Sequence, residues 1–343
     1  MWRVLRNQAA QVSSEAQNPT LAQVVRGFSG KRVVVVGDLV LDHYLLTHPQ
    51  RISREAPVLI LEHQGDRYLL GGGANALHNI LSLGGVPVPV GLLGKDEGGE
   101  TMLSILREKG VDTSGILQVD GWKTPVKTRV MAGGKNVARQ QVVRIDRGNS
   151  DPPDEAWLEA LAENLLQSAD DADAVLVSDY GYGITGGAVQ EAIASLMGRT
   201  VVSVDSRRRI LDFAGATVAT PNEPEAAEAL GLAGITDENV EECGRKLLEL
   251  TGNRAILLTR GQKGMALFTR EAKPLHIPIY GSDEVADVTG AGDTVIATFT
   301  LALAAGSDFA QAAKLSNYAG GIVVMKLGTA TVSQDELLRA VRN

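Results

Sequence analysis

The residues best suited to chemistry stand near the C-terminal end of the sequence, in the string Asp287-Val-Thr-Gly-Ala-Gly-Asp293-Thr294. An apolar segment of helical length follows at residues 293–305. Small residues at the start of a helix let backbone N–H groups point into open space, where they bind phosphate and other anions. These small residues are Gly290, Ala291 and Gly292. Asp293 would stand beside the anion and accept a proton from an attacking hydroxyl. The string also fits a plain helix N-cap, so spacing alone leaves both interpretations open.

A second glycine string competes for the role of nucleotide site. The string from Gly181 to Gly186 fits the G-x-G-x-x-G pattern of dinucleotide-binding loops, and Asp205 follows at a suitable distance for the acidic residue of that pattern. Residues 178–180 stand between the predicted strand and the first glycine, where the pattern requires a direct turn. An NAD-binding oxidoreductase is therefore the less favoured alternative.

Several other classes of protein are excluded by what the sequence lacks. No Gly-Lys pair is followed by Ser or Thr, and neither G-x-S-x-G nor H-E-x-x-H occurs, so the P-loop, nucleophile-elbow and zinc-protease motifs are missing. A formal charge of −8 disfavours a nucleic-acid partner. No apolar run has the length of a membrane span. The single cysteine, Cys243, excludes an intrachain disulfide and fits a reducing compartment, so we predict a cytoplasmic protein.

The elements that must position these residues follow an α/β pattern. Four consecutive valines at 33–36 predict a strand buried on both faces, as in parallel sheets. From residue 155 onward, strands and helices alternate, which predicts a mostly parallel sheet with helices on both faces. Residues 40–70 (with separate strands at 57–64 and 66–70) and residues 125–146 do not fit that sheet. They are expected to form a small second sheet, a lid.

Five strings in this order resemble the ribokinase-like (PfkB) carbohydrate kinases. They are VGDLVLD (36–42), GGGANALHN (71–79), NEPE (222–225), TRGQKG (259–264) and DVTGAGDT (287–294). The resemblance implies a three-layer αβα sandwich with a β-sheet lid and ATP-dependent phosphorylation of a sugar hydroxyl. It implies one kinase domain over residues 30–343, preceded by an N-terminal extension at 1–29. It also implies Mg-ATP, a monovalent cation such as K⁺, and a homodimer formed through the lid.

The same resemblance assigns roles to individual residues. Asp293 would be the general base, with the anion hole at 290–292. The sugar would contact Asp38, Asp42, Gly72, Gly73, Asn75 and Asp179. The nucleotide would contact Asn222, Thr259, Gly261, Gly264 and Asn317. Asn222 and Glu225 would hold Mg²⁺ through water, and Asp287 would lie near the monovalent cation. Asp38 and Asp42 also fit turn and cap positions after a buried strand.

Within the family, the sequence is most similar to kinases that phosphorylate the anomeric oxygen of a heptose 7-phosphate. The strings that resemble them include RISREAPV (51–58), VSDYG (177–181) and KLGTATVS (326–333). A phosphorylated substrate needs a cationic pocket. The candidates on or near the lid are Arg51, Arg54, Lys127, Arg129 and Arg144, of which we favour Lys127 and Arg144. Edge strands also carry charged residues against aggregation, so each assignment competes with a surface role.

Two departures affect the expected substrate. Tyr182 stands where heptose kinases usually carry lysine, and Asp205-Ser-Arg-Arg208 stands where they usually read Asp-Pro-Lys. Arg207 or Arg208 would then supply the missing charge. Fructose, ribose or a hexose phosphate are alternative substrates, and a catalytically silent sugar-binding protein is a further hypothesis. Some heptose kinases are fused to an adenylyltransferase with an H-x-G-H motif, which this sequence lacks, so only the kinase step is expected.

Overall fold

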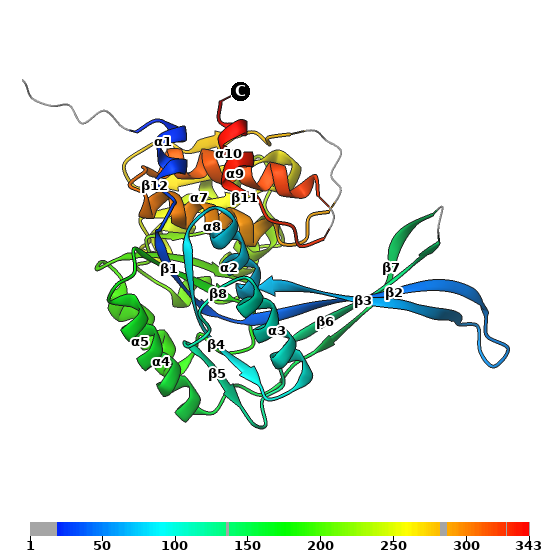
Figure 1. Ribbon diagram of the computed structural model, residues 1–343. Coiled ribbons are helices and arrows are strands. Elements are labelled where there is room, and N and C mark those ends of the chain that lie inside the picture. Colours follow the sequence, from blue (N-terminus) through cyan, green and yellow to red (C-terminus); the bar gives the residue numbers. More distant parts are fainter. Residues whose placement is uncertain (1–18, 135–136, 282–286, 327, 343) are drawn as a thin grey trace, which may run out of the picture.

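The computed structural model describes residues 19–342 with the exception of 135–136, 282–286 and 327. Most of the predicted N-terminal extension, residues 1–18, lies outside the described residues. The same holds for the tip of the predicted turn at 132–136. The described chain forms two sheets, a large one inside the body and a small one that projects from it (Figure 1).

The large sheet has nine strands in the order β13-β12-β11-β10-β9-β8-β1-β4-β5. All neighbours are parallel except that β12 pairs antiparallel with both β11 and β13. Its strands are β1 (Arg32–Gly37), β4 (Val86–Gly94), β5 (Ile116–Val119), β8 (Ala174–Asp179), β9 (Val201–Ser206), β10 (Val218–Ala219), β11 (Ala255–Thr259), β12 (Met265–Thr269) and β13 (Leu275–Ile277). The predicted parallel sheet is confirmed. The short strand β13 was not predicted, because its three residues carry no apolar run.

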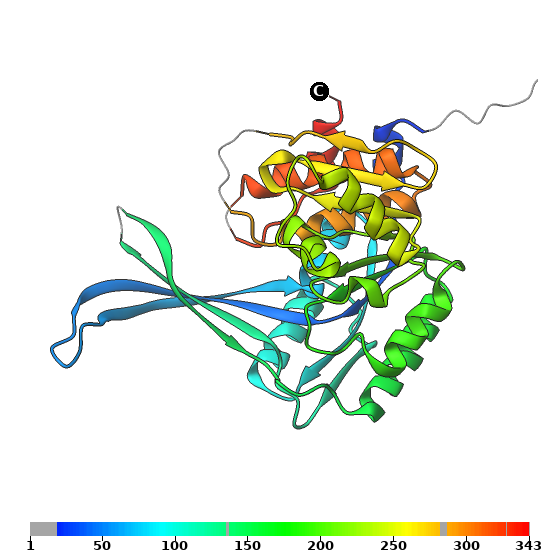
Figure 2. The ribbon, with the colours of Figure 1, turned by 180° about the vertical axis from the view of Figure 1, so that it is seen from behind.

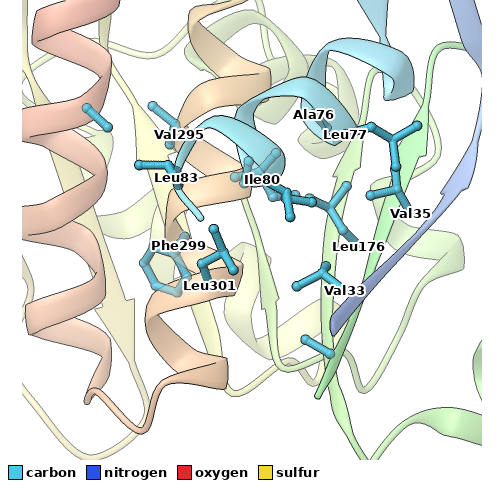
Figure 3. Close-up of a cluster of buried hydrophobic side chains, with 14 of the residues drawn as sticks. Val33, Val35, Ala76, Leu77, Ile80, Leu83, Leu176, Val295, Phe299 and Leu301 are labelled. Carbon is cyan, nitrogen blue, oxygen red and sulfur yellow. The ribbon is translucent and has the colours of Figure 1, made fainter. Parts of the chain in front are cut away.

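Helices cover both faces of this sheet and complete the predicted three-layer sandwich. On one face lie α2 (Gly73–Ser82), α3 (Glu97–Glu108), α8 (Ala291–Ala304) and α9 (Phe309–Val324). On the other lie α4 (Glu155–Ala169), α5 (Gly187–Leu196), α6 (Glu223–Leu230) and α7 (Val240–Thr251). The valine run shows the arrangement, since Val33 and Val35 join the first core (Figure 3) while Val34 and Val36 join the second.

The small sheet has the order β3-β2-β6-β7 and forms the predicted lid. Its strands are β2 (Leu39–Ile52), β3 (Leu59–Gly72), β6 (Val126–Gly134) and β7 (Val137–Arg147). Both views show it as a long twisted ribbon that extends away from the body (Figures 1 and 2). The prediction of two separate strands at 57–64 and 66–70 is wrong. β3 is continuous, because a bulge opposite Leu46 and Thr47 absorbs the irregularity near Gly65.

The ends of the described chain pack together. α1 (Leu21–Arg26) lies against α10 (Gln334–Ala340), and the Gln334 side chain donates a hydrogen bond to the Val25 carbonyl oxygen at 2.8 Å. Val24 and Val25 are buried in the core that α8 and α9 share. The domain boundary at residues 29 and 30 stays a prediction. In the part of the chain that the structure describes, no helix combines the length and the apolar character needed to cross a membrane.

Candidate active site

Asp293 lies in the first turn of α8, at the position predicted for it. The helix begins after Gly290, whose φ of +78° is a left-handed conformation that glycine adopts readily. A side chain at Gly290 would also be obstructed, because a Cβ atom there would lie 2.4 Å from Nδ2 of Asn75. Glycine at this position therefore allows the chain to turn into the helix against α2.

The Asp293 carboxylate is buried and held at both oxygens. Nδ2 of Asn75 donates to Oδ2 at 2.9 Å, and the Tyr180 hydroxyl donates to Oδ1 at 2.8 Å. Burial raises the pKa of Asp293 to about 6, although the two hydrogen bonds favour the charged form and oppose the shift. The group can thus be ionised near neutral pH and still accept a proton.

The backbone amides at the start of α8 provide part of the predicted anion hole. The N–H of Ala291 already donates to the Val288 carbonyl oxygen at 3.2 Å. Within the described residues, no protein acceptor is recorded for the N–H groups of Gly292 and Asp293. These two amides, at the positive end of a helix, are available to an anion.

Two cavities meet at this helix terminus. One, of about 230 Å³, is lined by Gly290 and Asp293 together with residues of the lid. The other, of about 270 Å³, is lined by Ala291 and Gly292 together with the loop after β11. Consecutive residues of one helical turn therefore face two different cavities, so that a group bound in one lies next to a group bound in the other.

The cavity on the lid side is rich in cations. Its lining residues include Lys127, Arg129, Arg144 and Arg207. Arg129 forms an ion pair with Asp42 at 2.6 Å, and Arg144 pairs with Asp146 at 2.8 Å. In the described structure, no carboxylate is within ion-pair distance of Lys127 or Arg207, and burial lowers the pKa of Lys127. The predicted cations Lys127 and Arg144 thus come together with Arg207 around one cavity.

Only some of the predicted sugar-binding residues line the cavity on the lid side. Asp42 and Gly72 line the cavity on the lid side. Asn75 instead contacts protein groups, since its side chain bonds Asp293 and the Gly290 carbonyl oxygen. The N–H of Gly73 donates to the carbonyl oxygen of Asp38, the residue before β2, at 3.0 Å. The sugar contact stays a prediction for all four residues.

Asp38 and Asp179 are buried, and their carboxylates accept hydrogen bonds from other residues of the chain. Oδ2 of Asp38 accepts the N–H groups of Tyr180 and Tyr182 at 2.6 and 3.1 Å, and burial raises the pKa of Asp38 to about 7. Oδ1 of Asp38 has no partner within the described residues. Asp179 accepts the Ser206 hydroxyl at 2.7 Å and the N–H of Gly181 at 3.1 Å. Neither residue lines the cavity, and their predicted sugar contacts remain hypotheses.

The second cavity is lined by four of the five predicted nucleotide residues, and the nucleotide contact of the fifth, Asn222, stays a prediction. Thr259, Gly261, Gly264 and Asn317 all line it, together with apolar residues of α8 and α9. Gly264 has φ of +83°, and a Cβ atom there would lie 2.0 Å from the Ile277 carbonyl oxygen. Asn317 donates to the Pro278 carbonyl oxygen at 2.9 Å. The loop after β11 is fixed by Arg260, which is nearly buried and bonds Glu223 at 2.8 Å.

Asn222 and Glu225 form a capping box at the start of α6. Oδ1 of Asn222 accepts the N–H of Glu225, and Oε2 of Glu225 accepts the N–H of Asn222, both at 2.9 Å. Asp205 lies near the start of α8, since its Oδ2 would be 3.9 Å from a Cβ atom placed on Gly292. Burial and then the nearby Glu225 and Asp293 carboxylates hold the pKa of Asp205 well above its usual range.

This surplus of negative charge suits a divalent cation. Oxygen donors are the ligands that Mg²⁺ prefers, and it commonly binds through one or two carboxylates, substrate phosphates and several waters. Within the described residues, no group of three or more His, Cys, Asp or Glu side chains is placed to enclose a metal. The residues present therefore fit Mg²⁺ held through water and phosphate rather than a closed protein cage.

Asp287 acts as a clamp between two loops. Its carboxylate accepts the N–H of Thr289 at 2.9 Å and the N–H of Gly328 at 3.0 Å. Burial opposes the change, but these hydrogen bonds lower the pKa of Asp287 and keep it charged. The adjacent residues 282–286 lie outside the described residues. A monovalent cation beside Asp287 stays a prediction.

Three amides of the competing glycine string are bonded within the chain. The N–H of Gly181 donates to Asp179, that of Tyr182 to Asp38, and that of Gly186 to the Gly183 carbonyl oxygen. The segment therefore uses its donors to fix the loop after β8. These bonds weigh against the oxidoreductase alternative.

The sequence analysis did not select Tyr180 for the site and considered Asp205 only for the dinucleotide alternative. Tyr180 directly follows β8 and Asp205 is the last residue but one of β9, so both stand at the carboxyl ends of parallel strands. Ligands of open α/β sheets bind at that edge. Attention to every polar residue at a predicted strand end would have selected both.

Comparison with known proteins gives a consistent family match. The family model described as pfkB family carbohydrate kinase matches residues 31–336. The bifunctional protein HldE of Caulobacter vibrioides is 41% identical over 323 residues, which cover 92% of this chain and 65% of that protein. HldE of Mesorhizobium japonicum is 39% identical over 324 residues, covering 94% of this chain and 64% of that protein. The chain thus spans less than two thirds of the length of these relatives.

Solved structures with the same fold are more distant in sequence. Arabidopsis thaliana ribokinase, complexed with ribose and ATP, has a TM-score of 0.69 at 22% identity and covers 92% of this chain and 99% of its own. Escherichia coli phosphofructokinase-2, in complex with potassium, has a TM-score of 0.73 at 17% identity and covers 91% of this chain and 98% of its own. These likenesses confirm the predicted ribokinase-like fold.

Proposed function

The chain belongs to the pfkB family of carbohydrate kinases, and we propose that it transfers the γ-phosphoryl group of ATP to the anomeric hydroxyl of a heptose 7-phosphate. The product would be a heptose 1,7-bisphosphate. The class of reaction, ATP-dependent phosphorylation of a sugar, follows from the family. The heptose is supported by the strings shared with heptose kinases and by the match to the HldE proteins.

The observation that carries the proposal is the meeting of two cavities at the start of α8. The sugar would bind in the cavity that Asp293 lines, and the nucleotide in the cavity that Gly292 lines. The γ-phosphoryl group would then lie at the free amides of Gly292 and Asp293. Phosphoryl transfer depends mainly on positioning and charge stabilisation, and this arrangement supplies both.

Each proton and bond in the proposed reaction can be accounted for. Asp293 accepts the proton of the sugar hydroxyl while the sugar oxygen bonds to the γ-phosphorus of ATP. The bond between that phosphorus and the β,γ-bridging oxygen breaks, and ADP leaves with the electron pair. When bound, Mg²⁺ would neutralise charge on the phosphates, held through water by Asn222 and Glu225. The amides at the start of α8 stabilise the charge on the transferred group.

The phosphate already present on the substrate would be bound by the cations of the lid-side cavity. Lys127 is buried, and neither it nor Arg207 has a carboxylate partner at ion-pair distance in the described structure. A dianionic phosphate would satisfy both cations, and burying unpaired charge is otherwise costly. The cavity therefore favours a sugar phosphate over a neutral sugar.

Replacing Lys127 tests this choice of substrate. We expect Lys127→Met to raise the KM for the sugar phosphate by about tenfold or more, because a charge-assisted hydrogen bond is lost. The KM for ATP should change little, because Lys127 does not line the cavity of the nucleotide. The matched control is Lys123→Met, an exposed lysine four positions earlier that does not line the cavity. Equal KM values for both variants would contradict a phosphate contact at Lys127.

The activity itself is tested by a coupled assay of ADP release with Mg-ATP. Heptose 7-phosphate, fructose 6-phosphate, ribose and fructose are offered separately, and the product is analysed by phosphorus NMR. We expect the highest kcat/KM with heptose 7-phosphate and a new anomeric phosphate. Turnover confined to unphosphorylated sugars would contradict the heptose proposal, and absence of turnover with every sugar would favour the silent sugar-binding hypothesis.

We also propose a homodimer formed through the lid. Val143 and Ile145 on β7 are 47% and 58% exposed, and Ile52 near the far end of β2 is 65% exposed. Apolar side chains on a projecting sheet are commonly covered by a partner.

Localisation in the cytoplasm stays a prediction.

A charge on the lid should separate the dimer. We expect the wild-type chain to elute at dimer mass in size-exclusion chromatography with light scattering, and Val143→Asp to elute at monomer mass. Leu250→Asp is the control, since Leu250 is 54% exposed but lies on α7, outside the lid. A wild-type monomer, or a dimer that survives Val143→Asp, would contradict this assembly.

A further inference from the structure

Tyr180 links the lid-side cavity to the base, and no role was assigned to it above. It follows the last residue of β8, and its hydroxyl donates to Oδ1 of Asp293 at 2.8 Å across 113 residues of sequence. Its backbone N–H donates to the buried Asp38 carboxylate at 2.6 Å. The residue is therefore held at its backbone and at the tip of its side chain.

The ring of Tyr180 is also contacted by two cations from different elements. The Lys127 Nζ atom lies 4.9 Å from the ring centroid, and the Arg207 guanidinium carbon lies 4.2 Å from it. Cation–π contacts at such distances restrict the ring. Lys127 belongs to lid strand β6 and Arg207 to the loop after β9, so the ring position depends on the lid and on the body together.

We propose that Tyr180 is a positioning residue of the phosphoryl-transfer centre, whose hydroxyl fixes the Asp293 carboxylate while Lys127 and Arg207 hold its ring. The inference rests on the proposed function. Asn75 restrains Oδ2 of Asp293 from α2, and Tyr180 restrains Oδ1 from the opposite chain segment after β8. Two hydrogen bonds, one on each oxygen, disfavour rotation of the carboxylate and would keep its remaining lone pairs directed toward the sugar hydroxyl. Small errors in such alignment cost large factors in rate.

The hydroxyl has a second effect on Asp293. A hydrogen bond donated to a carboxylate stabilises its charged form. The charged groups nearby act in both directions, since Asp42 on β2 and Asp205 on β9 disfavour the ionised carboxylate, whereas Arg207 favours it. Burial and the nearby Asp293 carboxylate hold the pKa of Tyr180 well above its usual range, so its hydroxyl keeps its proton and stays a donor.

The test is Tyr180→Phe, which keeps the ring and its cation contacts and removes the hydroxyl. With a phosphorylated sugar and Mg-ATP, we expect kcat at pH 8 to fall about tenfold, while both KM values change less than about threefold. The acid limb of the kcat/KM profile should move to higher pH, because Asp293 loses a donor that favours its ionised form. A residue with a merely structural role would not move that limb.

Tyr68→Phe is the matched control. Tyr68 is a lid residue whose ring stacks on His43 at 4.6 Å and which lines neither cavity. It should keep the wild-type kcat and pH profile. The proposal is overturned if the acid limb of Tyr180→Phe coincides with that of the wild type, or if its kcat at pH 8 stays within twofold. These outcomes presuppose wild-type turnover, whereas failure of the proposed function would appear as no wild-type turnover with any sugar phosphate.

Discussion

Asp293→Asn should lower kcat by a factor of about 10³ while the protein stays folded and still binds Mg-ATP. An amide cannot accept the proton of the sugar hydroxyl at neutral pH. It can, however, satisfy both present partners, because its oxygen accepts from Asn75 and its nitrogen donates to the Tyr180 hydroxyl. The loss should therefore fall on chemistry and not on folding.

The measurement is steady-state kinetics of ADP release, with thermal unfolding and calorimetric titration of Mg-ATP as checks on folding and binding. Asp120→Asn is the control, since its carboxylate is 82% exposed and, among the described residues, forms an ion pair only with Lys95 on the surface. It should be indistinguishable from the wild type. If Asp293→Asn kept more than a tenth of the wild-type kcat, Asp293 would not be the base.

The wild-type pH profile gives a second view of the same group. Burial raises the pKa of Asp293 to about 6, and only the ionised carboxylate accepts a proton. As pH falls through about 6, kcat/KM should decline, and the plot of log kcat/KM against pH should approach a slope of one, as expected for protonation of one group. The decline should be missing from the residual activity of Asp293→Asn.

Much of the fold could be predicted from local patterns. The valines of β1 and the alternation after residue 155 are dictated by burial on both sides of a parallel sheet, and the structure confirms them. The lid was predicted from a different pattern. Its strands alternate between polar and apolar residues and therefore do not fit a sheet that is buried on both faces. β13 was missed because three residues at a sheet edge are placed by their neighbours and not by their own sequence.

The site was predictable only where chemistry follows chain order. Gly290 to Asp293 are adjacent, so a helix N-terminus with its anion hole and base could be inferred from spacing. The contact of Tyr180 with Asp293, and those of Lys127 and Arg207 with the Tyr180 ring, join segments far apart in the sequence. Their assembly depends on the start of β6 meeting the ends of β8 and β9, which no single stretch of sequence specifies.

Asn75 illustrates the same limit in the other direction. The resemblance assigned it to the sugar, a contact that stays a prediction, and gave no sign that its amide bonds Asp293 and the Gly290 carbonyl oxygen. A motif identifies a residue as part of a site without identifying the atom that it contacts. This arrangement makes Gly290 a sensitive position, because the backbone there and the restraint on the base share one side chain.

Gly290→Ala should consequently lower kcat about a hundredfold or more. A Cβ atom at Gly290 would lie 2.4 Å from Nδ2 of Asn75, and real Cβ contacts are never that short, so Asn75 must move away from Asp293. The base would lose its partner on Oδ2, and the turn that presents the free amides of Gly292 and Asp293 would shift. The φ of +78° adds a stability cost of about 1 kcal/mol for any L-residue.

Gly306 provides a control that separates backbone strain from the displacement of Asn75. Gly306, just after the helix ends, has φ of +85°, and nothing lies within 4 Å of a Cβ atom placed there. Gly306→Ala should therefore lose a similar amount of stability in thermal unfolding while it keeps the wild-type kcat. If both variants lost stability and neither lost activity, the contact between Gly290 and Asn75 would have no part in aligning the base. If only Gly290→Ala lost activity, the loss would be assigned to the displaced Asn75 and not to backbone strain.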